Sequence, residues 1–170
     1  MGTKMITSEA NKFTLKELAS AGVGGYRSLA RWSDRLGDPS PDALPRRPGR
    51  TIRCDLWTSF TISLAARLAG DAVPIQALKM VVDDLRRDDP GFWRRVESGK
   101  HPKDGRELLS VVKTQSEKMV SIGLIDRTRE SAWSLTEGGN KVLLLDLHAH
   151  ARELLERLEG LPREEALDVA

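Results

Sequence analysis

The hydrophobic positions in the first third of the chain predict two short helices joined by a tight turn. Thr14 and Glu17 form a capping box, in which a hydroxyl and a carboxylate each bond a backbone N–H at the start of a helix. Glycines in residues 21–25 interrupt the helical pattern, because they accept left-handed backbone angles. Residues 26–36 then resume it, with Leu29 on the apolar side.

Two further helices are predicted after a segment that cannot be one. Residues 38–53 contain four prolines, so we expect an arginine-rich loop or small hairpin there, with a flexible basic linker as the alternative. From Asp55 to Leu68 apolar residues recur at three- and four-residue spacing, and a second such stripe follows Pro74. We expect both stripes to lie in a hydrophobic core.

The turn-forming residues 88–91 predict a boundary between two domains, residues 1–87 and residues 88–170. In the second domain the pattern predicts three helices and two strands. They are a short helix from residue 92, a longer helix over about residues 105–122, two short strands within residues 124–135, and a last helix over about residues 137–159. The fold class is therefore expected to be mainly α, with small β-wings.

Composition places the chain among ordinary globular proteins, since 39% of its 170 residues are hydrophobic and 31% are charged. The single cysteine, Cys54, cannot form an internal disulfide, which favours a reducing compartment. No apolar run has the ~20 residues of a membrane span, and residues 1–12 lack the apolar core of a signal peptide. We expect a cytoplasmic protein that does not contact a membrane.

The formal net charge of +2 hides an alternation of basic and acidic blocks. The net charge is +5 over residues 1–53, −2 over residues 54–85, +3 over residues 86–130 and −4 over residues 131–170. Such blocks occur by chance on a solvated surface, and they are also typical of two basic surfaces that face an acidic partner. The polar side of the helix at residues 26–36 carries three arginines, whose guanidinium groups suit phosphates and base edges. The alternative for each arginine is a simple solvated helix face.

Five segments of the first domain resemble, in order and spacing, the DNA-binding domain of MerR-type regulators. They are FTLKELASAGV (13–23), SLARW (28–32), RTIR (50–53), FTISLAARLAG (60–70) and IQALK (75–79). The resemblance covers about residues 12–87 and implies a helix-turn-helix, a basic wing and a supporting helix pair. The chain departs from the family pattern at Gly24 and Gly25, where a hydroxyl cap is usual, and it lacks the long coiled coil and effector cysteines of metal-sensing members.

Two segments of the second domain resemble winged-helix regulators of the MarR and PadR families. They are GLIDR (123–127) and WSLTEGG (133–139), which match the exit of a recognition helix and its wing. The resemblance implies that residues 105–122 form a second recognition helix. The predicted fold is then two winged helix-turn-helix units in tandem.

Together the two resemblances imply a set of DNA-contacting residues. In the first unit these are Tyr26, Arg27, Ser28, Arg31, Arg35, Arg46, Arg47, Arg50 and Arg53. In the second unit they are Lys103, Arg106, Ser110, Lys113, Thr114, Lys118, Arg127 and Arg129. The function so implied is a sequence-specific double-stranded DNA-binding transcriptional regulator, with repression as one mode, associated with DNA in the cytoplasm.

The last predicted helix carries leucines at helical spacing. Leu143, Leu147, Leu154 and Leu158 either pack on the chain's own second domain or form a homodimer with a second copy. We leave both alternatives open.

Catalytic and metal-binding motifs are not recognised in the sequence. His148 and His150 are two residues apart, so on a helix they point in different directions and cannot share a metal. We expect no enzymatic activity, no cofactor and no metal. Two other functions are considered, a winged-helix protein-interaction module and an excisionase-like architectural DNA-binding protein.

Overall fold

The computed structural model describes residues 12–36, 52–69, 73–100, 106–113, 120–126 and 141–161. In chain order the elements are β1 (Phe13–Thr14), α1 (Leu15–Ser20), α2 (Tyr26–Leu36), β2 (Arg53–Cys54), α3 (Leu56–Arg67), α4 (Ile75–Asp88), α5 (Phe92–Ser98), β3 (Arg106–Lys113), β4 (Val120–Asp126), β5 (Lys141–Asp146) and α7 (Leu147–Glu159). Helices predominate beside two small antiparallel sheets, so the coarse fold class predicted from the sequence is confirmed.

The first unit begins with the predicted helix pair. The backbone N–H of Glu17 donates to Thr14 Oγ1 at 3.2 Å, and the N–H of Thr14 donates to Glu17 Oε2 at 2.6 Å, which confirms the capping box. Gly22 forms the turn at a φ of 71°, and the N–H of Val23 then bonds the carbonyl of Leu18. Strand β1 pairs with β2, which places Thr14 opposite Arg53.

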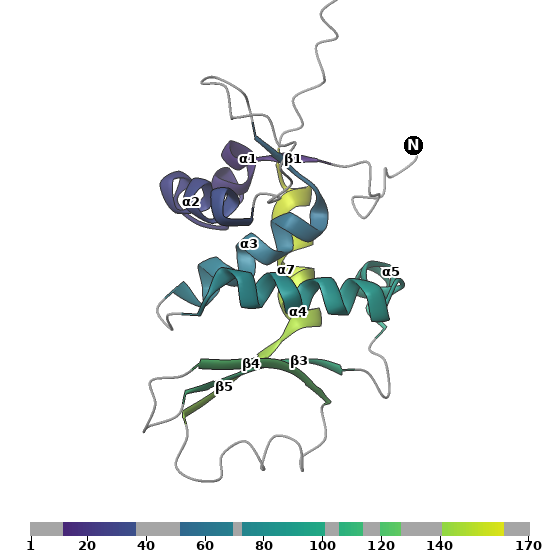
Figure 1. The fold of residues 1–170 in the computed structure, drawn as a ribbon. Coiled ribbons are helices and arrows are strands. Elements are labelled where there is room, and N and C mark those ends of the chain that lie inside the picture. Colours follow the sequence, from purple (N-terminus) through teal and green to yellow (C-terminus); the bar gives the residue numbers. More distant parts are fainter. Residues whose placement is uncertain are drawn as a thin grey trace, which may run out of the picture.

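Helix α3 lies at the centre of the molecule, in contact with α2, α4 and α7 (Figure 1). Nine of its twelve residues are buried, so the helix lacks the broad solvent-exposed side that a surface helix has. Its buried hydroxyls bond its own backbone carbonyls, Thr61 to Trp57 at 2.9 Å and Ser63 to Phe60 at 2.7 Å. These bonds let a helix with polar residues be buried without unsatisfied hydroxyl groups.

One continuous hydrophobic core joins the two predicted domains. Trp57 and Phe60 of α3 contact Phe92 and Trp93 of α5, with ring centroids 5.2–5.8 Å apart between the two helices. Helix α7 runs from the three-stranded sheet up to the α1–α2 pair, across the back of α4 (Figure 1). The turn at residues 88–91 separates α4 from α5, and the core passes across it.

The second predicted recognition helix, residues 105–122, is wrong. The described part of this segment is strand, because β3 and β4 pair antiparallel and β5 pairs with the other edge of β3. Leu109 and Val111 of β3 point into the core, at the two-residue period of a strand. The tandem arrangement of two helix-turn-helix units therefore loses its second recognition helix. Of the two short strands predicted within residues 124–135, the first overlaps the end of β4, and the second lies outside the described residues.

The last helix begins ten residues later than predicted, at Leu147, because Lys141–Asp146 forms β5. Asp146 caps the helix by accepting the N–H of Ala149 at 2.9 Å. Leu147, Leu154 and Leu158 are each at most 3% exposed in the single chain, and Leu143 of β5 packs against the same core. Of the two alternatives for these leucines, the structure favours packing on the chain's own fold.

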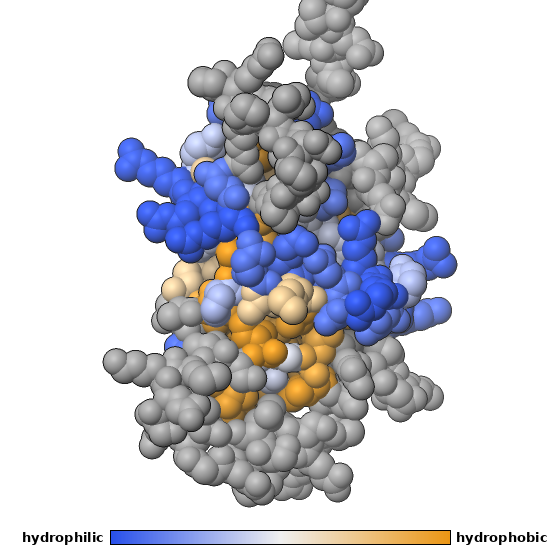
Figure 2. All heavy atoms as spheres, viewed as in Figure 1, coloured by the Kyte–Doolittle hydropathy of each residue, from blue (hydrophilic) through white to orange (hydrophobic). Residues whose placement is uncertain are grey.

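The surface separates into polar and apolar regions. Strongly hydrophilic side chains project where Figure 1 places α2, whereas hydrophobic side chains lie between α4 and the sheet (Figure 2). Met80 of α4 is the most exposed large hydrophobic residue of the described part, at 68%. Among the described residues, no helix has the length and apolar character needed to cross a bilayer.

Replacing Gly22 by alanine should destabilise the protein by about 1 to 2 kcal/mol, because a Cβ disfavours its φ of 71°. Gly160 is the matched control, since it also follows a helix but has a φ of −71° that alanine adopts readily. Urea denaturation of both variants measures the difference. Equal stability of the two variants would contradict the requirement for a left-handed turn between α1 and α2.

Candidate functional site

A basic face on α2 is the first candidate site. We define the basic face as Arg27, Arg31 and Arg35, which recur every four residues and so lie along one side of the helix. All three are exposed, and they form no ion pair with any residue in the described ranges. The opposite side of α2 packs into the core through Leu29 and Leu36.

Both ends of α2 are held by neighbouring elements. The side chain of Gln76 in α4 donates a hydrogen bond to the carbonyl of Arg35 near the C-terminus of α2. At the other end, Gly24 lies so close to Leu29 that an added Cβ would stand 3.3 Å from its Cδ2. The basic face is therefore presented on a fixed helix whose first residues, Tyr26 and Ser28, are also exposed.

A polar groove of about 520 Å³ adjoins the C-terminal half of α2. Arg53 of β2 lines it together with Lys12 from before β1 and Ser33 from α2. Lys12 and Arg53 are exposed and make no ion pair within the described part of the chain. The groove meets α2 at Ser33 and Leu36, on the side that faces the core, and its lining also includes the carboxylates of Asp55 and Asp83. Lys12 and Arg53 therefore form a second basic region, separate from the basic face.

The other predicted DNA-contacting residues are not brought together in this way. Ser110 is 4% exposed in the middle of β3 and donates to the carbonyl of Gly123 at 3.1 Å, so it cannot contact DNA. Arg106 and Lys113 mark the two ends of β3, where they are paired in register with Asp126 and Val120 of β4. The remaining eight, Arg46, Arg47, Arg50, Lys103, Thr114, Lys118, Arg127 and Arg129, lie outside the described residues.

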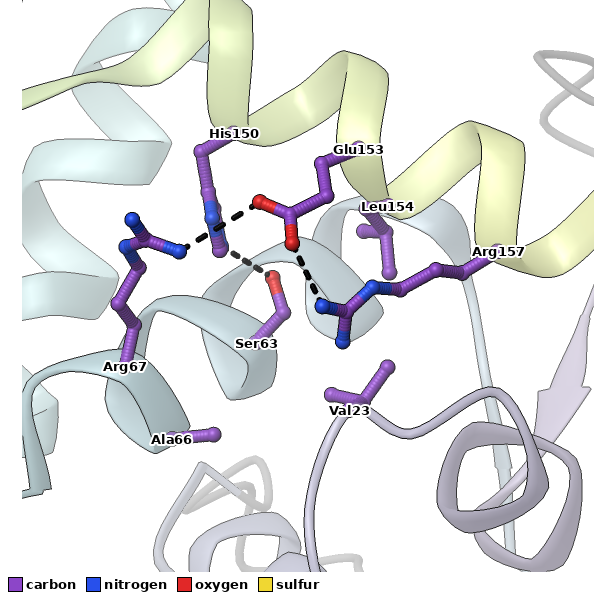
Figure 3. A pocket seen from close by; sticks show the side chains of 8 residues that line it. All are labelled: Val23, Ser63, Ala66, Arg67, His150, Glu153, Leu154 and Arg157. Carbon is purple, nitrogen blue, oxygen red and sulfur yellow. Dashed lines mark hydrogen bonds and ion pairs between the residues drawn. The ribbon is translucent and has the colours of Figure 1, made fainter.

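A second polar cluster, not predicted from the sequence, joins α7 to α3 and to the turn before α2. Arg157 donates to the carbonyl of Gly22 at 2.8 Å and pairs with Glu153 at 2.5 Å. Arg67 of α3 approaches the other oxygen of the same carboxylate, at 3.4 Å (Figure 3). The C-terminal helix is thereby connected directly to the backbone of the α1–α2 turn.

His150 lies at the inner end of this cluster. Its Nε2 is 2.9 Å from Ser63 Oγ, and the Ser63 hydroxyl already donates to the carbonyl of Phe60. Nε2 therefore carries the proton and donates to Ser63. Burial, and next the positive charges of Arg67 and Arg157, lower the pKa of His150 to about 4, although Glu153 acts in the opposite direction.

The cluster had a signal in the sequence. His150, Glu153 and Arg157 are spaced by three and four residues, as are the partners Ser63 and Arg67 on another predicted helix. Polar residues at helical spacing on two helices indicate a contact between them only if the two helices are already known to pack together. The sequence placed them in different domains, so the contact could not be foreseen.

We expect the stability of the protein to fall as the pH is lowered from about 6.5 to about 4. In this window the unfolded chain protonates His150 while the folded chain keeps it neutral, so protons favour unfolding. The pKa difference corresponds to at most about 3 kcal/mol. Urea denaturation at several pH values, with His150→Gln as the comparison, measures it, since glutamine can still donate to Ser63. An unchanged pH dependence in the variant would contradict the assignment.

Comparison with known proteins adds no family assignment. No model of a known protein family matches the chain, and no curated protein sequence matches it significantly. Within the ranges that the structure describes, no three His, Cys, Asp or Glu side chains are grouped so that they could hold a metal ion. The function is therefore inferred from the geometry of the basic face and its supports.

Proposed function

We propose that the chain is a double-stranded DNA-binding transcriptional regulator with a single recognition helix, α2. The observation that carries the proposal is the basic face, in which three exposed arginines stand on one side of a helix whose other side is packed in the core. A helix in the major groove reads base edges through such residues, most often by a bidentate contact of arginine to guanine.

The structure around α2 is consistent with this role. Helix α1 packs against it, and the exposed Lys12 and Arg53, beside the β1–β2 pair, add positive charge that DNA phosphates can contact. The resemblance to MerR-type domains implies a helix-turn-helix followed by a helix pair, and the order α1, turn, α2, α3 and α4 supports the proposal. The role of the proline-rich segment as a wing remains part of the proposal.

The three-stranded sheet, as far as the structure describes it, does not provide a second recognition helix. Its central strand β3 faces the core with Leu109 and Val111, and the predicted helix that would have entered a second groove is absent from the described part of the segment. We propose instead that the second unit holds α2 in place through α5 and α7. One chain then recognises one major-groove site.

Replacing Arg27 or Arg31 by alanine should weaken binding to the preferred duplex by about 1 to 3 kcal/mol, because each loses a base contact. Arg94→Ala is the matched control, since Arg94 is an exposed arginine on α5, which Figure 1 places at the opposite side of the molecule from α2. Fluorescence anisotropy at one fixed salt concentration measures the affinities. An equal loss on all DNA sequences would assign the arginine to phosphate, and no loss would contradict the recognition role of α2.

Selection of bound sequences from a random duplex library should yield one asymmetric motif no longer than about one helical turn, ~10 base pairs. The reason is that one chain presents one recognition helix. Native mass spectrometry of the selected complex gives the number of chains. A long motif bound by one chain would show that a second part of the chain reads DNA, and absence of enrichment would contradict sequence-specific binding.

A further inference from the structure

A cavity of about 150 Å³ lies where α3, α7 and the α1–α2 turn meet. We call it the junction cavity. Arg67, Arg157 and Glu153 form its charged lining, and Val23, Ala66 and Leu154 form its apolar lining (Figure 3). A cavity of this volume holds a ligand of roughly six non-hydrogen atoms. Because the cavity is partly open to solvent, this size limits the part of a ligand that enters it.

The charged residues of the junction cavity favour a negatively charged ligand. Two guanidinium groups share a single carboxylate, so the lining has an excess of one positive charge. Arg67 is held loosely, at 3.4 Å from Glu153 and with about half of its side chain exposed. It is free to turn toward an anion that enters beside Glu153. Guanidinium groups bind oxyanions with two parallel hydrogen bonds, so a carboxylate or phosphate group suits them best.

The inner lining contains a buried polar group that the protein leaves without a partner. His150 is 9% exposed, and its Nδ1 forms no hydrogen bond with any described residue. Ser63, which is 5% exposed, lies beside it. A buried imidazole nitrogen without a partner is costly. Because the proton is on Nε2, Nδ1 can only accept, so the ligand that satisfies it carries an O–H group beside its anionic oxygens, as a hydrogen phosphate or a hydroxy acid does.

The position of the cavity connects it to α2. Arg157 lines the cavity and also donates to the carbonyl of Gly22, the residue that forms the turn. An anion that bonds Arg157 competes with this carbonyl for the same guanidinium group. Occupation of the cavity would therefore release the turn and, through it, the first residues of the recognition helix.

We propose that the junction cavity binds a small free oxyanion, a phosphate or carboxylate compound, between Arg67 and Arg157, and that binding lowers the affinity of α2 for DNA. The second half of this statement rests on the proposed function, whereas anion binding does not. A phosphate group of the DNA backbone is the other oxyanion that could bind these two arginines. It reaches only the exposed arginines at the rim, whereas a free anion also reaches the buried Ser63 and His150.

Anion binding is tested by NMR of the full chain, with sodium phosphate added against sodium chloride of equal ionic strength. Phosphate should shift the amide signals of Gly22, Val23 and His150 in a saturable way, with a Kd of about 1 mM or below. It should also raise the pKa of His150 from about 4, because a nearby anion favours the imidazolium form. Absence of saturable shifts at these residues would overturn the proposal.

Three variants separate a binding site from a purely structural ion-pair cluster. Arg67→Gln should weaken phosphate binding about tenfold, because a charge-assisted hydrogen bond is lost. Glu153→Gln should strengthen it by about threefold or more, because the competing carboxylate is removed. Arg94→Gln, on α5, should change nothing. If Glu153→Gln weakened binding, or if Arg67→Gln bound like the wild type, the site would be refuted.

The effect on DNA is measured with the selected duplex at constant ionic strength. Phosphate should lower the affinity of the wild type by roughly fivefold or more, and that of Arg67→Gln much less. If the chain bound no duplex at all, the proposed function would fail while the NMR experiment still decided anion binding. Duplex binding that phosphate leaves unchanged would overturn the regulatory role, and shifts that appear only with duplex present would assign the oxyanion to DNA.

Discussion

The burial of α3 on nearly every side is the constraint on which the rest of the structure depends. A helix of twelve residues with nine of them buried needs other elements around it, and α2, α4, α5 and α7 supply them. The helix can occupy this position because its hydroxyl groups bond its own carbonyls, as Thr61 does with Trp57. Residues far apart in the sequence thus pack on one central helix, and the two predicted domains become parts of one core.

The same constraint explains how the recognition helix proposed above is held. Helix α2 contacts α3 through its apolar side. Helix α7 also contacts α3, and its Arg157 donates a hydrogen bond to the turn before α2. The aromatic cluster of Trp57, Phe60, Phe92 and Trp93 keeps α5 on α3 as well. The second half of the chain therefore packs against the elements that hold α2, which is the supporting role proposed for it above.

The first half could be predicted from the sequence because its signals are local. The capping box at Thr14 and the glycine at position 22 act within a few residues, and the helices they delimit were placed almost to the residue. Residues 108–112 carry no such local signal. A run of leucine and valine fits a buried strand as well as one turn of a helix, and only pairing with β4 and β5, which lie further along the chain, decides between them. For the same reason, the pattern of residues 141–146 indicated part of the last helix, whereas the structure has strand β5 there.

The polar cluster at the α1–α2 turn shows why a contact between two helices cannot be predicted from the sequence, although all of its residues are visible there. Ser63 and Arg67 lie one helical turn apart, and His150, Glu153 and Arg157 follow the same rule, yet neither set indicates its partner. The partner is decided by how α7 crosses α3, which depends on the sheet that starts α7 at Leu147. Because the sheet sets where α7 begins, it also sets which guanidinium group reaches Gly22. A change in β5 or in the first turn of α7 would therefore alter the contact at Gly22 and, through the turn, the position of α2, although none of these bonds joins the sheet to α2.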